Sequence, residues 1–150
     1  MSRVPTILTI GYAHATQAAL VAALTGAGVE LLADVRALAN SRRPGFSKNS
    51  LRAAVEEAGI GYRQFKHLGT PKEGRDAARR GDYATLKRVY SGQLELPEAL
   101  GQMAELCELA LHRRTCLLCY CQACDACHRG LLVKELFADF ERLDLEPAAG

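Results

Sequence analysis

Short apolar runs alternate with longer, helix-like stretches along the chain. The runs are rich in β-branched and aliphatic residues and predict four strands, over 6–10, 31–35, 62–66 and 115–120. Helices are predicted over 17–26, capped by Thr16, over 50–59, capped by Ser47, from Pro97 onward, and over 128–140. The stretch 68–83 is basic, rich in turn residues and only partly helical. Strand–helix alternation of this kind predicts an α/β fold.

The predicted architecture is a mostly parallel sheet of about four strands, with helices on both faces. No repeat or internal linker divides the sequence, so we expect a single domain over 1–150 with its core at about 6–140. The tail 145–150 is expected to be frayed. In the helix that Pro97 opens, one face is predicted to carry Leu100, Met103, Ala104, Cys107 and Leu111.

Composition and charge exclude several classes of protein. The 150 residues are 49% hydrophobic and 24% charged, which is ordinary for a globular domain, and the net charge of +2 alone implies neither nucleic acid nor membrane. No apolar run reaches the roughly 18 residues of a membrane span, so no membrane partner is expected. The N-terminal apolar run reads as a strand without a cleavage site, which favours a cytoplasmic location and reduced thiols.

Polar or special residues follow every predicted strand. These are Gly11-Tyr12, Asp34-Val35-Arg36, His67-Leu68-Gly69 and Cys119, with Cys127-His128-Arg129 nearby. The carboxyl ends of parallel strands share one edge, where ligands bind in open α/β sheets. His14 and His67 are candidate acid–base groups at this edge. A ligand site at this edge is therefore predicted.

The stretch 116–130 contains five of the six cysteines and leaves several kinds of chemistry open. A haem on Cys124, Cys127 and His128 is disfavoured by the lack of an export signal. Zinc or iron could be held by Cys119 or Cys121 with Cys124, Cys127 and His128, although no cofactor is expected. A dithiol pair is also open, either Cys121 with Cys124 or Cys124 with Cys127. Cys107 and Cys116 are assigned to the core.

We favour the interpretation that Cys127, His128 and Arg129 form a thiol or anion site at a helix N-terminus. Unpaired backbone N–H groups and the helix dipole there stabilise a thiolate or a bound phosphate. A neighbouring cation lowers the pKa of a thiol, and Arg129 can grip a phosphate through paired hydrogen bonds. Asp34 and Arg36 lie two apart on one strand face, so both can reach the same edge.

The motifs at these positions resemble the domain of unknown function 488 family. They are TIGY, LLADVR with SRRPGFSK, HLGTPK, and LLC-x7-CHR, in the family's order over about 6–140. The resemblance implies a compact α/β domain with no established reaction. Its motif positions here are Gly11, Asp34, Arg36, Arg42, Arg43, Leu68, Gly69, Cys119, Cys127, His128 and Arg129. Cys121 stands where the family commonly has an acidic residue, and Cys116, Cys121 and Cys124 look additional to its pattern.

The prediction is a small enzyme with a Cys/His/Arg/Asp site that acts on an anionic, phosphate- or nucleotide-containing substrate. Cys127 or Cys119 would supply the thiolate, and Asp34 or His128 would orient groups or transfer a proton. Anion binding is assigned to Arg129, Arg36, Arg42, Arg43, Gly11, Tyr12 and Gly69. Should a metal bind, its ligands would be Cys121, Cys124, Cys127 and His128.

The alternative is a non-enzymatic binding module for a metal or for nucleic acid. The basic stretches 41–43, 71–80 and 112–114 could follow a phosphate backbone, with aromatic residues available for stacking. No known nucleic-acid motif accompanies them. The sequence leaves the substrate and the oligomeric state open.

Overall fold

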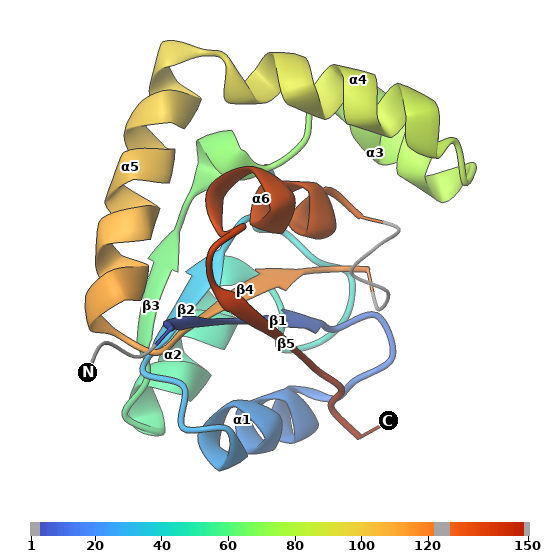
Figure 1. Cartoon of the computed structure of the whole chain (residues 1–150). Helices are drawn as coiled ribbons and strands as arrows, with labels where there is room; N and C mark the ends of the chain where they lie inside the picture. Colours follow the sequence, from blue (N-terminus) through green and yellow to red (C-terminus); the bar gives the residue numbers. More distant parts are fainter. Residues whose placement is uncertain (1–3, 122–126, 149–150) are drawn as a thin grey trace.

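Residues 4–121 and 127–148 are described by a computed structural model, in which a five-stranded sheet lies between two layers of helices (Figure 1). The strand order is β3-β2-β4-β1-β5, and every neighbouring pair is parallel. The strands are β1 (Thr6–Gly11), β2 (Leu31–Asp34), β3 (Gly61–Gln64), β4 (Thr115–Cys119) and β5 (Glu141–Leu145). The predicted α/β class and parallel sheet are confirmed.

The helices cover both faces of this sheet. They are α1 (Gln17–Gly26), α2 (Lys48–Glu57), α3 (Lys72–Arg79), α4 (Tyr83–Leu94), α5 (Pro97–His112) and α6 (His128–Leu136), with a 3₁₀ turn at Lys66–Leu68. Leu20 and Leu51 of α1 and α2 pack with Leu8 against one face. Leu106 and Leu132 of α5 and α6 pack with Ile7 against the other. Because neighbouring strand residues point to opposite faces, the three central strands β1, β2 and β4 contribute to both apolar layers.

Local signals set several helix starts. The Thr16 side chain accepts a hydrogen bond from the Ala19 backbone N–H, as the predicted cap requires, and Pro97 occupies the first turn of α5. Ser47 precedes α2 but makes no cap bond, because its hydroxyl accepts from the Ser41 backbone N–H and donates to the Ser41 carbonyl oxygen instead. The side-chain part of the Ser47 prediction was therefore wrong.

Two elements were missed and several boundaries differ. Helix α3 lies within the stretch 68–83 that was expected to be only partly helical. Helix α4 lies after it, where no element was predicted, and Asp82 caps it by accepting from the Thr85 backbone N–H. The last helix stops at Leu136 rather than at 140, because the chain turns into β5 there. Strand β5 pairs with β1 as far as Leu145, the first residue of the stretch expected to be frayed. Strand β3 ends at Gln64, two residues before the predicted end.

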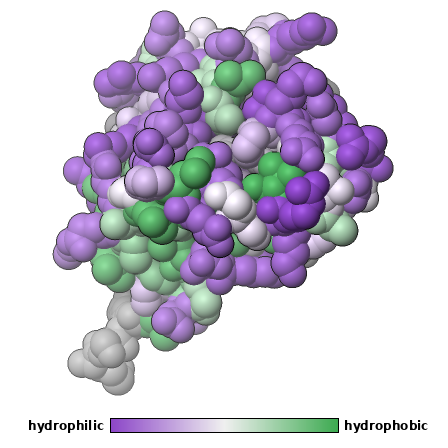
Figure 2. Space-filling model, turned by 90° about the horizontal axis from the view of Figure 1, so that it is seen from above, coloured by the Kyte–Doolittle hydropathy of each residue, from purple (hydrophilic) through white to green (hydrophobic). Residues whose placement is uncertain are grey.

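The buried face of α5 differs from the predicted one. Met103 is buried as expected, but its buried neighbours are Ala99, Leu106 and Ala110. Leu100 and Leu111 are more than half exposed. Seen from above the α4–α5 end, the surface is mostly hydrophilic, and its hydrophobic patches are small (Figure 2). Of the two cysteines assigned to the core, Cys116 is fully buried and Cys107 half-buried.

Strands β1 and β4 are neighbours whose connections leave the sheet toward opposite faces. The chain after β1 leads to α1, whereas the chain after β4 leads to α6 in the other layer (Figure 1). Such a switch point leaves a crevice outside the carboxyl ends of the strands. Gly11 and Cys119 are register partners at this point. None of the helices in the described part of the chain has both the length and the apolar character needed to cross a membrane.

Candidate active site

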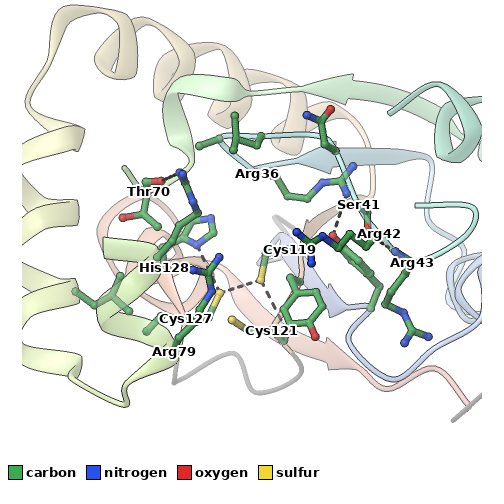
Figure 3. Close-up of a pocket in the computed structure, with 18 residues that line it drawn as sticks. Arg36, Ser41, Arg42, Arg43, Thr70, Arg79, Cys119, Cys121, Cys127 and His128 are labelled. Carbon is green, nitrogen blue, oxygen red and sulfur yellow. Dashed lines mark hydrogen bonds between the residues drawn. The ribbon is translucent and has the colours of Figure 1, made fainter. Parts of the chain in front are cut away.

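A cavity of about 950 Å³ opens at this switch point (Figure 3). Its walls come from Tyr12 after β1, from the loop after β2, from α3, and from the residues on either side of the chain segment between β4 and α6. The site predicted at the carboxyl edge of the sheet therefore coincides with a real cavity.

Three thiols gather at one wall of the cavity. The Cys119 and Cys127 sulfur atoms are 2.8 Å apart, and both side chains are buried. The Cys121 sulfur lies within 4.8 Å of each of them, and Cys121 is half-buried. In Figure 3 the three sulfurs lie between His128 and the group formed by Ser41, Arg42 and Arg43. The two predicted catalytic cysteines are thus brought together, with Cys121 as the more exposed third thiol.

The secondary structure fixes the thiols in place. Cys119 is the last residue of β4. Cys116 lies three positions earlier, so its side chain points to the opposite face of the sheet, where it packs with α1 and α2. Cys127 is the N-cap of α6, and its sulfur accepts the Arg129 backbone N–H at 3.5 Å. A helix N-terminus favours negative charge, so this position favours thiolate character in the cluster.

Arg129 contacts the thiol cluster from the interior of the protein. Its guanidinium is buried and donates to the Cys119 sulfur at 3.0 Å, to the Cys121 carbonyl oxygen at 2.9 Å and to the Ile10 carbonyl oxygen at 2.8 Å. Arg129 does not line the cavity. It was expected to bind an external anion, but these contacts make it the counter-charge of the thiols and a clamp between β1 and the start of the next loop.

The thiols differ in the pKa that their surroundings impose. Burial raises the pKa of Cys119 and raises that of Cys127 well above the ordinary value. Hydrogen bonds from Cys119 and Cys127 lower the pKa of Cys121, and the nearby Arg129 charge lowers it further. We therefore assign one negative charge to the cluster, on the half-buried Cys121 sulfur beside the two buried thiols.

His128 faces the same thiols as a neutral ring. Burial lowers its pKa, so the ring is uncharged near neutrality. Nε2 lies 2.7 Å from the Val35 carbonyl oxygen, which can only accept, so Nε2 carries the proton. Nδ1 is then unprotonated and lies 3.6 Å from the Cys127 sulfur. The ring is held as a proton acceptor beside the cluster, and its role in proton transfer stays a prediction.

Arginines dominate the remaining walls. Five of them line the cavity, and no described lining residue is acidic; they are Arg36, Arg42, Arg43, Arg75 and Arg79. Thr70 also lines it, with a buried hydroxyl that has no hydrogen-bond partner among the described residues. At its edge lie Leu38 and Tyr120, each 55% exposed. Guanidinium groups recognise phosphate and carboxylate through paired hydrogen bonds, so the lining suits an anion.

Asp34 and Arg36 form a buried ion pair rather than a reactive couple. Arg36 Nε and Nη2 donate to the two Asp34 carboxylate oxygens at 2.8 and 2.7 Å, and the Tyr62 hydroxyl also donates to Asp34. Arg36 Nη1 donates to the Phe46 carbonyl oxygen and the Tyr12 hydroxyl. Asp34 is fully buried and does not line the cavity. Its contacts assign it to holding the loop after β2, not to proton transfer.

The predicted glycines act through close backbone contacts. A Cβ on Gly11 would lie 1.8 Å from the Cys121 carbonyl oxygen, and one on Gly69 would lie 2.0 Å from the Ala37 backbone nitrogen. Each position admits no side chain, so each lets two site-forming loops touch. Tyr12 lines the cavity and stacks on Phe46, with ring centroids 4.5 Å apart.

Arg42 and Arg43 lie on the wall opposite the thiols, as Figure 3 shows. Arg42 is exposed, and Arg43 donates to the Ala15 carbonyl oxygen. Both arginines therefore line the cavity, and their anion-binding role stays a prediction. His14 and His67, by contrast, do not line the cavity.

The cavity residues that were missed as site residues include Thr70, Arg75 and Arg79. The two arginines lie four apart on α3, which puts them on one face of that helix. The sequence pattern showed their basic stretch, 71–80, but it was interpreted only as a surface that could bind the phosphate backbone of a nucleic acid. Its position directly after the HLGTPK motif, itself downstream of a strand end, was the signal that placed it at this edge.

A metal could be held by Cys119, Cys121 and Cys127. Three protein ligands with an open fourth position are typical of catalytic zinc. Zinc–sulfur bonds of about 2.3 Å at tetrahedral angles need sulfurs about 3.8 Å apart. Cys119 and Cys127, at 2.8 Å, would have to separate by about 1 Å to reach that spacing. Of the predicted ligand set, Cys124 lies outside the described residues.

Comparison with known families places the chain. The family model described as "Domain of unknown function DUF488" matches residues 16–136. The chain belongs to this family. The DUF488 match includes the five cavity arginines and the three clustered cysteines, and it begins after Gly11 and Tyr12. No curated protein and no solved structure matches the chain.

Proposed function

We propose that this DUF488 protein is an enzyme that binds a small phosphate-bearing molecule in the arginine-lined cavity and acts on it through the Cys121 thiolate. The observation that carries the proposal is the lining itself, with three thiols on the adjoining wall and no described carboxylate. Of its five arginines, Arg36 and Arg79 pair with Asp34 and Asp76 behind the wall. The positive charges of Arg42, Arg43 and Arg75 have no carboxylate partner among the described residues and are left for a ligand. Such a lining favours a ligand with two or more negative charges.

The choice of nucleophile follows from exposure. Cys119 and Cys127 are each 1% exposed, whereas Cys121 is half-buried, so a ligand in the cavity reaches Cys121 first. The two neighbouring thiols lower the pKa of Cys121, which favours the ionised form of its sulfur. In the proposed step a bond forms between this sulfur and the electrophilic atom of the bound anion, while the bond to the leaving group breaks and that group keeps the electron pair.

Binding is tested by titrating the reduced protein with pyrophosphate at low salt. Arg75 is half-buried and fixed by its bond to the Thr70 carbonyl oxygen, so Arg75→Gln should weaken binding about tenfold. The matched control is Arg88→Gln on the neighbouring helix, where Arg88 pairs with Glu73 and does not line the cavity. Equal affinities for the two variants would contradict the assignment of the anion to this cavity.

Catalysis is tested separately with a panel of phosphate monoesters and anhydrides. Cys121→Ser should remove turnover while leaving the pyrophosphate affinity within about threefold, because serine keeps the shape of the wall but not the thiolate. Turnover that survives this substitution would exclude Cys121 as nucleophile. Binding without any turnover in the unaltered protein would leave an anion-binding module in place of an enzyme.

The second candidate is a metal centre on the three cysteines, favoured by their convergence within 4.8 Å. Purified protein would then contain about one equivalent of zinc or iron by elemental analysis. Cys119→Ser should lower that content, since it removes one of the three ligands, whereas Cys107→Ser on α5 should not. Metal-free protein that binds pyrophosphate unchanged would exclude this candidate.

A further inference from the structure

We propose that Cys119 and Cys127 close into a reversible disulfide when the protein meets a hydroperoxide, with Cys121 as the thiol that reacts first. This goes beyond the anion chemistry proposed above and does not depend on it. The three sulfurs would act as a relay from the cavity to a buried pair.

The geometry of the buried pair carries the argument. Both cysteines are free, and their sulfurs are 2.8 Å apart. A disulfide has a sulfur–sulfur bond of about 2.05 Å, so closure needs a movement of less than about 1 Å. One sulfur stands at the end of β4 and the other at the start of α6, and backbone hydrogen bonds hold both elements. The pair is therefore preorganised for the bond.

Access decides which thiol meets the oxidant. Cys119 and Cys127 are each 1% exposed, so a dissolved hydroperoxide reaches them more slowly than it reaches Cys121. Cys121 is half-buried, lines the cavity and lies within 4.8 Å of both. A thiol in this position can react with a hydroperoxide from solvent and then pass the oxidation to the buried thiols by thiol–disulfide exchange.

The relay has three balanced steps. The Cys121 sulfur attacks the hydroperoxide, so a sulfur–oxygen bond forms, the oxygen–oxygen bond breaks, and an alcohol or water leaves. Cys127 then attacks the oxidised Cys121 sulfur, which forms the Cys121–Cys127 disulfide and releases water with the thiol proton. Cys119 next attacks the Cys127 sulfur 2.8 Å away, and Cys121 leaves as the thiol. Overall, one hydroperoxide is reduced and two thiols are oxidised.

The final position of the disulfide follows from its surroundings. A bond between Cys119 and Cys127 is buried, out of reach of small thiols, whereas one that includes Cys121 stays open to the cavity. Exposed disulfides are reduced more readily than buried ones. The third step thus moves the oxidation from a labile bond to a protected one and restores Cys121 to the cavity.

The first measurement is a thiol count on the full-length protein, pretreated with a chelator and exposed to one equivalent of hydrogen peroxide. The chain has six cysteines, so titration in denaturant should fall from six thiols to four, and dithiothreitol should restore six. Six thiols remaining after peroxide would overturn the proposal. So would a covalent dimer in place of an internal bond.

Peptide mapping identifies the pair, because natural cleavage points separate the cysteines. Cleavage after Tyr120, before Asp125 and after Arg129 puts Cys119, Cys121 and Cys127 on three different peptides. The expected product links the Cys119 peptide to the Cys127 peptide, and fragmentation distinguishes Cys119 from Cys116. A dominant link to the peptide of Cys121 and Cys124 would overturn the assignment.

Variants test the order of steps. Cys127→Ser lacks the partner of both disulfides in the relay, so peroxide should oxidise only Cys121, and dithiothreitol should restore all five remaining thiols. Cys121→Ser should still form the buried disulfide, but about tenfold more slowly. Cys107→Ser, outside the cluster, should match the unaltered protein in rate and in the two thiols lost. An unchanged rate in Cys121→Ser would overturn the relay. Pyrophosphate affinity of the reduced protein is measured independently, so failure here leaves the proposed function standing.

Discussion

Single residues at the carboxyl edge act mainly by allowing or fixing contacts between loops. Gly11 admits the Cys121 carbonyl oxygen and Arg129, and the Asp34–Arg36 pair anchors the loop after β2. The sequence placed these residues at one edge, because their positions after predicted strands were visible. It could not separate a reactive Asp34 from a structural one, since the pattern does not show that Arg36, two residues on, bonds both carboxylate oxygens or that the Tyr62 hydroxyl of β3 joins it.

Gly11→Ala should destabilise the protein and displace the segment that carries Cys121. The new Cβ would lie 1.8 Å from a backbone oxygen, so the loss in the free energy of unfolding should be about 3 kcal/mol or more. Gly101→Ala in α5 is the control, because its Cβ meets nothing within 4 Å, and it should stabilise by up to about 1 kcal/mol. Denaturant unfolding of both variants checks this; equal stabilities would contradict the close contact.

Alkylation of Cys121 should remain fast as the pH is lowered from 8 to 6. Hydrogen bonds from Cys119 and Cys127 lower the pKa of Cys121, so its thiolate persists where an ordinary thiol, with a pKa of about 8.5, is protonated. The rate of iodoacetamide labelling at Cys121, followed by mass spectrometry, measures this. A rate that falls about tenfold per pH unit in this window would show an ordinary thiol.

At the scale of whole elements, the sequence identified most strands and helices but not every face. Apolar residues on α5 form two overlapping stripes, and both Leu100 and Leu106 fit the helical period beside Met103. Only packing against the sheet selects the stripe that contains Leu106. Strand β5 was missed because its polar sequence, ERLDL, is that of a half-exposed edge strand and lacks the apolar run that marked the others.

Helix α4 should depend on one buried hydrogen bond to the HLGTPK loop. The Tyr90 hydroxyl donates to the Leu68 carbonyl oxygen at 2.6 Å, so Tyr90→Phe leaves that oxygen unpaired and should cost about 1–3 kcal/mol. Tyr83→Phe, on the same helix but 37% exposed, should change stability by less than about 0.5 kcal/mol. Thermal or urea unfolding compares the two; similar losses would contradict a special role for Tyr90.

For the molecule as a whole, a nearly balanced net charge hides a strongly uneven distribution. The chain carries only +2 in total, yet five arginines and no described acidic residue line one cavity. Composition could not reveal this, because the arginines come from separate segments, the loop after β2 and helix α3. The α/β topology, by contrast, followed from the alternation of patterns along the chain and was predicted.

Pyrophosphate should therefore stabilise the folded protein more than chloride at equal ionic strength. A ligand present at 100 times its dissociation constant adds about 2.7 kcal/mol, which for this chain length raises the melting temperature by about 5–10 °C. Arg75→Gln should reduce the shift at a fixed pyrophosphate concentration, because binding is weaker. Equal shifts with sodium chloride would indicate screening of charge repulsion in place of binding.

The size of the cavity also sets where selection of the ligand takes place. A volume of about 950 Å³ corresponds to a space about 10 Å across, close to the Debye length of about 8 Å at physiological ionic strength. The field of the arginines is thus screened within about one cavity width of the mouth. Anions should reach the cavity by ordinary diffusion, with little attraction over long range, and the arginines should select between them only after entry. Discrimination between them should appear in dissociation rates rather than in association rates.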